Sequence, residues 1–134
     1  MFLKKNKNNN DLIKVGALLI HAAKIDENYS YIEQNIIKKA LLKIGADNDN
    51  IEKIMSDAIE AEENSNQILD FTREVKNTSN ENKIIILETL WRIIYSNNEV
   101  DIYESNLMRR LAGLLYIDNK IMADIKDKIK KENL

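Results

Sequence analysis

The feature that most constrains this chain is its lack of residues that stop helices. It has no proline and only three glycines in 134 residues. Since these two residues end helices and form tight turns, their scarcity favours helices over a turn-rich β fold. Apolar residues also recur with helical spacing, as in the run Ile51, Ile54, Met55, Ala58 and Ile59. The sequence therefore predicts an all-α fold.

Two stretches, 12–25 and 84–94, are apolar nearly all round. Helices of this kind lie at the centre of a bundle, contacted from several sides. Capping residues stand before the apolar runs at Ser30, Ser65, Ser79, Asp101 and Asp118, and Gly45 is placed to end a helix. The predicted helices cover residues 11–25, 31–44, 50–63, 66–76, 80–96, 102–116 and 119–131. Their short connections predict neighbours that pack antiparallel.

We expect a single domain over residues 11–134, preceded by a flexible segment at 1–10, because no internal linker is long enough to divide the chain. Disulfides and thiolate metal sites are excluded by the absence of cysteine. A net charge of −2 argues against a nucleic-acid partner. The apolar run 12–23 is too short to span a bilayer and has no signal-peptide features, which predicts a cytoplasmic protein.

An internal repeat emerges when the sequence is shifted against itself by 71 residues, which places 22–33 on 93–104. Each copy reads as an apolar helix, a short oxygen-rich loop and an amphipathic helix. The pattern predicts a pseudo-twofold repeat of helix–acidic loop–helix units. Its matching oxygen-bearing side chains are Asp26, Asn28, Ser30 and Glu33 in the first copy, and Asn97, Glu99, Asp101 and Glu104 in the second.

Two interpretations of these loops compete. The first is helix capping, because Ser30 and Glu33, like Asp101 and Glu104, have the spacing of a capping box. The second is a divalent cation, because alternating oxygen ligands between two helices resemble an EF-hand. An EF-hand needs a glycine at loop position 6 and a glutamate at position 12, and neither loop has them. A cation site would therefore require both loops to converge, or waters to complete the coordination shell.

The sequence contains no recognisable set of catalytic residues. His21 is the only histidine, which excludes a zinc site and favours a partly exposed polar position on a packed helix. No nucleophile with a supporting base and no glycine-rich phosphate loop occurs. Trp91 is expected in the core. Acidic residues gather between 47 and 63, where they form either a solvated helix face or a surface that binds a protein partner.

A family resemblance follows from the order of motifs in the second half of the chain. These motifs are Asp70-Phe71-Thr72-Arg73, Leu90-Trp91-Arg92, Glu99-Val100-Asp101-Ile102-Tyr103-Glu104 and the run from Leu107 to Tyr116. Together with the weaker match at 18–33, they resemble the tellurite-resistance TerB-like family, in its uncharacterised bacterial branch.

This resemblance implies an all-helical fold of about seven helices and no enzymatic activity. It also implies a role in tellurite resistance or the stress response, with peripheral association with membrane complexes. The loop acids suspected of binding metal in the family correspond here to Asp26, Glu33, Asp101 and Glu104. The family's usual Asp-Gly is replaced by Asn97-Asn98 in the second loop. That change removes an anionic ligand and favours the capping interpretation.

Overall fold

The structure is a computed structural model that describes residues 2–24, 30–65, 69–95 and 102–132. Within these residues the fold is all-α, with seven helices and no strand. The helices are α1 (Phe2–Ala23), α2 (Tyr31–Ile44), α3 (Ile51–Glu63), α4 (Leu69–Lys76), α5 (Asn80–Tyr95), α6 (Ile102–Leu114) and α7 (Asn119–Glu132). The predicted fold class and helix order are confirmed.

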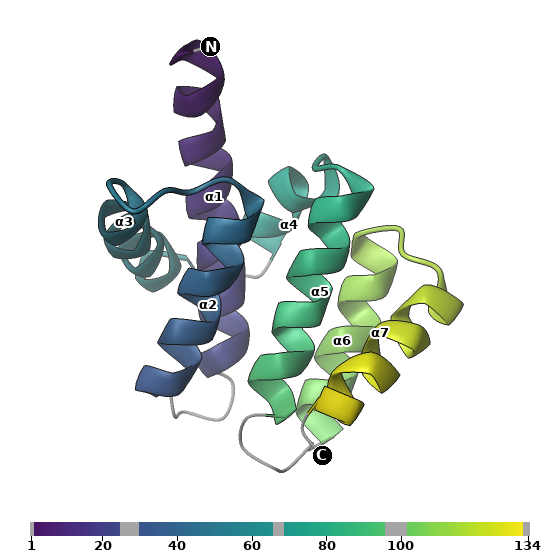
Figure 1. Cartoon of the computed structure of the whole chain (residues 1–134). Coiled ribbons are helices and arrows are strands. Elements are labelled where there is room, and N and C mark those ends of the chain that lie inside the picture. Colours follow the sequence, from purple (N-terminus) through teal and green to yellow (C-terminus); the bar gives the residue numbers. More distant parts are fainter. Residues whose placement is uncertain (1, 25–29, 66–68, 96–101, 133–134) are drawn as a thin grey trace.

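Helix α1 differs most from its predicted bounds. It begins at Phe2, whereas the sequence predicted a helix from residue 11 after a flexible segment. The prediction relied on the apolar pattern, which begins at Leu12, but no proline or glycine interrupts the preceding residues. The backbone hydrogen bonds of a helix need no apolar face, so the helix extends further back along the chain. In Figure 1 this N-terminal part of α1 projects beyond the other helices.

Helices α1 and α5 form the middle of the bundle and run in the same direction (Figure 1). Helix α1 packs against α2, α3, α4 and α5, and α5 packs against α1, α2 and α7. Both helices therefore meet neighbours on several sides, as their apolar sequences predict. Leu18 and Leu19 of α1 and Leu87 and Leu90 of α5 are fully buried. Ile84 is an exception at 38% exposed, so α5 is not buried on every side near its start.

The predicted helix ends at Ser30, Ser79 and Asp118 are confirmed. The backbone N–H of Asn82 donates to the Ser79 hydroxyl, and that of Lys120 donates to the Asp118 carboxylate. Gly45 ends α2 with a φ of 150°, a conformation that side chains with a Cβ rarely adopt. Asp101 and residues 66–68 lie outside the described residues, so the caps predicted at Asp101 and Ser65 stay predictions.

The turns that follow α2 and α6 share the same hydrogen bonds. At the end of each helix a backbone N–H donates to the carbonyl five residues earlier, and in each turn an aspartate carboxylate accepts the backbone N–H two residues later. The four donor–acceptor pairs are Ala46–Leu41 (2.9 Å) and Asp49–Asp47 (2.9 Å), then, 71 residues later, Ile117–Ala112 (2.9 Å) and Lys120–Asp118 (2.8 Å).

Candidate functional site

Four helix ends meet at one end of the bundle. Helices α1 and α5 finish there, and α2 and α6 begin there (Figure 1). We call this the acidic-loop end, because the two loops singled out in the sequence leave from these helices. The arrangement follows from two central helices that run in the same direction, each followed by an antiparallel partner.

Glu33 is the one predicted metal ligand whose side chain the structure describes. It is buried in the first turn of α2, with 1% of its surface exposed. Its Oε1 accepts the N–H of Ser30 at 3.0 Å, and its own N–H donates to the Ser30 hydroxyl at 3.2 Å. This reciprocal pair is a complete capping box. The capping interpretation is therefore confirmed for the first loop.

The remaining predicted ligands cannot be placed around Glu33. Asp26 and Asp101 lie outside the described residues, and Glu104 lies in α6 with its side chain outside them. Among the side chains that are described, no three histidine, cysteine or acidic groups come together as metal ligands would. Since Ca²⁺ takes six to eight oxygens, Glu33 alone does not make a site. Metal binding at these loops stays a prediction.

An ion cluster between α1 and α3 was not foreseen from the sequence. Glu62 is 8% exposed and accepts a hydrogen bond from the Lys24 ammonium at 2.7 Å. The His21 Nδ1 lies 3.4 Å from the other carboxylate oxygen, and His21 is partly exposed as predicted. The available signal was the spacing of His21 and Lys24, one helical turn apart at the end of the apolar stretch that begins at Val15. Glu62 therefore belongs to the interface between α1 and α3.

The rest of the acidic stretch divides into paired and unpaired side chains. Glu52 pairs with Lys38, and Asp57 pairs with Lys53 of the same helix at 3.1 Å. Asp49, Glu60 and Glu63 are exposed and form no ion pair with any described residue. Glu60 and Glu63, which share the last turn of α3, make up what we call the acidic patch, and Asp49 lies at the other end of this helix.

Helix α7 is held to α5 by two ion pairs. The Arg92 guanidinium donates two hydrogen bonds of 3.0 Å to the Glu132 carboxylate. These bonds hold the pKa of Glu132 below its ordinary value of 4.5, an effect opposed by partial desolvation. The second pair joins Lys128 to Glu88. Both pairs connect the same two helices, so they fix how α7 lies across α5.

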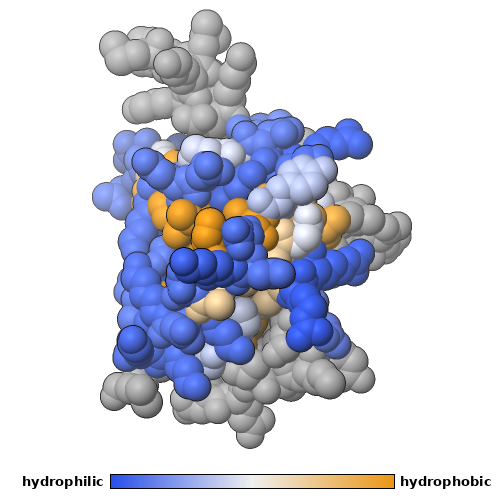
Figure 2. Space-filling view, turned by 90° about the vertical axis from the view of Figure 1, so that its right-hand side faces the viewer, coloured by the Kyte–Doolittle hydropathy of each residue, from blue (hydrophilic) through white to orange (hydrophobic). Residues whose placement is uncertain are grey.

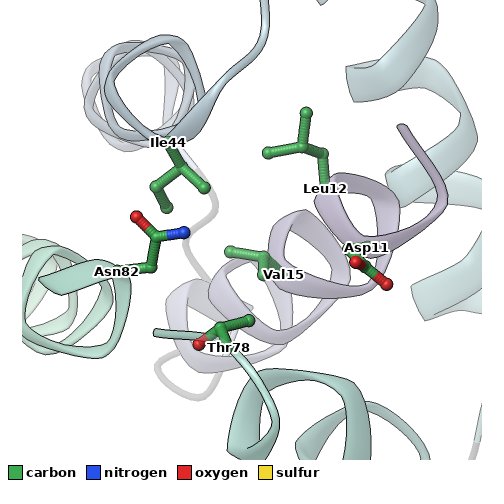
Figure 3. A pocket seen from close by; sticks show the side chains of 6 residues that line it. All are labelled: Asp11, Leu12, Val15, Ile44, Thr78 and Asn82. Carbon is green, nitrogen blue, oxygen red and sulfur yellow. The ribbon is translucent and has the colours of Figure 1, made fainter. Parts of the chain in front are cut away.

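A small pocket lies between α1, the end of α2 and the segment that joins α4 to α5 (Figure 3). Its volume is about 240 Å³. Asp11 is the one titratable residue among its described lining residues, and the carboxylate points away from Val15 and Asn82 in Figure 3. The Thr78 hydroxyl donates to the carbonyl of Val75. No nucleophile–base pair faces this space, so its walls offer packing and no acid–base chemistry.

These features define an all-helical protein in which several charged side chains cap helices or form ion pairs between them. A comparison with protein families matches the model "Tellurite resistance protein TerB" over residues 12–127. The chain belongs to the TerB family. Searches of curated proteins and of solved structures give no match. Within the described residues, no helix is long and apolar enough to cross a membrane.

Proposed function

We propose that this TerB-family chain is a non-enzymatic interaction module of a stress or tellurite-resistance response, which binds a protein partner through its acidic patch. The main support for this proposal is the position of Glu60 and Glu63 in the last turn of α3. This turn contains no basic residue. A helix C-terminus carries partial negative charge, and acidic groups there are unfavourable by about 0.3–1 kcal/mol each. A basic partner surface would offset this cost.

The charge distribution supports a partner at this position. Glu62, between the two exposed glutamates, already pairs with Lys24 just after α1 and has the His21 ring of α1 beside it. The patch carboxylates have no such partner in the described part of the chain and face solvent. Complementary charge raises association rates and selects partners, so the expected partner carries a cluster of lysines or arginines.

The test is affinity purification of the tagged chain from its host, comparing the wild type with Glu60→Lys/Glu63→Lys. We expect the variant to lose a specific partner that the wild type retains. Glu62 is left unchanged because its replacement would break the ion cluster with α1. The matched control is Asp124→Lys/Asp127→Lys, which makes the same change in charge on the exposed face of α7. An identical set of partners for the wild type and both variants would contradict the proposal.

The alternative function is divalent-cation binding at the acidic-loop end, with Asp26, Glu33, Asp101 and Glu104 as ligands. Its support is the common position of the helix ends that carry the two loops. The capping box occupies Glu33 Oε1 with a backbone N–H. A cation would therefore have to share this carboxylate with the cap, and would draw its other anionic ligands from the loops and from the start of α6.

Thermal unfolding with and without Ca²⁺, Mg²⁺ or Mn²⁺ separates the two roles. Without added ion, Ser30→Ala should lose about 1 kcal/mol of stability through its cap, whereas Asp26→Asn should lose almost none. An ion that binds the folded chain and is present at a hundredfold excess over its Kd would add about 2.7 kcal/mol to the free energy of unfolding. A shift of that size, abolished by Asp26→Asn, would establish the cation site. No shift with any ion would leave capping as the role of this pattern.

A further inference from the structure

Two grooves of this fold can be compared position by position, because the turns after α2 and α6 share their hydrogen bonds at a spacing of 71 residues. In the first groove, between α2 and α3, Leu41 and Met55 are buried side chains. The ion pair between Lys38 and Glu52 links the two helices across it. At these positions α2 and α3 therefore have buried apolar side chains and a pair of charges that links the two helices.

The second groove lies between α6 and α7 over Trp91 of α5, and it is open. Ala112 takes the place of Leu41, Lys126 that of Met55, and Ala123 that of Glu52. These changes remove one large apolar side chain and the acid that would pair with Arg109. A groove of about 260 Å³ results, lined by Trp91, Met108, Arg109, Ala112, Asn119, Met122, Ala123 and Lys126. On this face hydrophobic atoms lie among hydrophilic ones (Figure 2).

The walls of the groove combine an apolar floor with positive charge. Trp91 is 3% exposed, and its indole N–H has no hydrogen-bond acceptor among the described residues. The Lys126 ammonium lies 5.3 Å from the centre of the Trp91 ring. Neither Lys126 nor Arg109 forms an ion pair with the described part of the chain. Both cations are exposed to solvent at the edge of the groove, so their charge favours an anionic ligand there.

We propose that the groove between α6 and α7 binds a small organic carboxylate with an apolar body. The apolar body would contact Met108, Met122 and the Trp91 ring. The carboxylate would accept hydrogen bonds from the exposed Arg109 and Lys126 side chains. The volume lies below the range of about 300–1,000 Å³ typical of pockets for drug-sized ligands, so the ligand is small.

Trp91 is the only tryptophan, so its fluorescence reports directly on the groove. We would titrate the full chain with phenylacetate, with phenylacetamide, which lacks the charge, and with acetate, which lacks the apolar body. The expected result is a saturable change in Trp91 fluorescence with phenylacetate and with neither of the other two compounds. The double variant Arg109→Gln/Lys126→Gln should weaken binding at least tenfold, whereas Lys130→Gln, an exposed control on the same helix, should leave it unchanged.

A second variant imitates the closed groove. Ala123→Glu places an acid where Glu52 stands in the first groove, so it should pair with Arg109 and abolish the response to phenylacetate. Its melting temperature and helical circular dichroism check that the variant is folded. The proposal is overturned if phenylacetate gives no saturable change in the wild type, or if phenylacetamide acts equally well. It is also overturned if folded Ala123→Glu still binds.

Discussion

Trp91 lies where three helices meet, and its ring makes contacts of three kinds. It is buried against the core, it stacks on Tyr95 with ring centres 5.9 Å apart, and it carries the Lys126 ammonium over its face. Burial contributes most of the energy, because a large aromatic side chain removes much apolar surface from water. The two ring contacts fix its orientation. Trp91 therefore ties α5 to α7 at the level of a single side chain.

Replacing this ring should be severely destabilising. We expect Trp91→Ala to lose about 3–5 kcal/mol of unfolding free energy, because it leaves a cavity that the surrounding helices cannot fill. Urea unfolding followed by circular dichroism measures the loss. Ile32→Ala is the control, since Ile32 is 64% exposed and its replacement should change stability by no more than about 0.5 kcal/mol. Equal losses in the two variants would contradict the buried position of Trp91.

Two glycines inside helices differ in the space around them. A Cβ added at Gly16 would lie 2.9 Å from the Ala58 Cβ, whereas one added at Gly113 would meet no atom within 4 Å. We expect Gly113→Ala to stabilise the protein by about 0.5–1 kcal/mol through helix propensity. Gly16→Ala should destabilise it by about 1–3 kcal/mol through overpacking of α1 on α3. Thermal unfolding measures both changes. A gain in stability in both variants would contradict the close approach of Gly16 to Ala58.

Among the helices, α7 is the one whose position depends most on ion pairs. Its exposed face is rich in lysine and aspartate, and Met122, Ile125 and Ile129 form its buried side. The bidentate pair between Arg92 and Glu132 holds its last turn on α5. Because Glu132 is 41% exposed, solvent screens the pair and its contribution to stability is modest. The pair therefore fixes the position of α7, and apolar burial provides most of its binding energy.

This pair gives α7 a defined response to acid. The folded pKa of Glu132 is lowered, so its contribution to stability is complete above the ordinary value of 4.5 and disappears as pH falls through the folded pKa. Below pH 4.5 the melting temperature of the wild type should therefore fall more steeply than that of Glu132→Gln. Parallel curves for the two proteins would show that Arg92 does not hold Glu132 in solution.

At the scale of the whole molecule, periodicity and caps were enough to predict the helix order and the two central helices. Both signals are local, so they can be read from neighbouring residues. The predicted start of α1 at residue 11 was wrong, because a helical segment without an apolar face leaves no periodic signal in the sequence. The interface role of Glu62 and the bond between Arg92 and Glu132 also escaped prediction. Their partners lie about 40 residues away, and only the packing of α3 on α1 and of α7 on α5 brings them together.

The candidate site was predictable to a similar extent. The capping box at Ser30 and Glu33 follows from a spacing of three residues, and it was predicted. The groove over Trp91 was not, because it depends on which side chains are short at Ala112 and Ala123 once α6 and α7 are in place. A missing side chain gives no signal in one sequence, except by comparison with the residues that stand 71 positions earlier.

The many neighbours of α1 also determine the order in which the backbone opens. Because α1 packs against four helices, the amide protons of Leu18 and Leu19 should exchange with deuterium only when the whole fold opens. Helix α7 packs mainly on α5, so its amides near Ile125 should exchange through a partial opening that leaves α1 intact. Mass spectrometry of peptides from the two helices measures this difference. Equal protection would mean that the seven helices open as one unit.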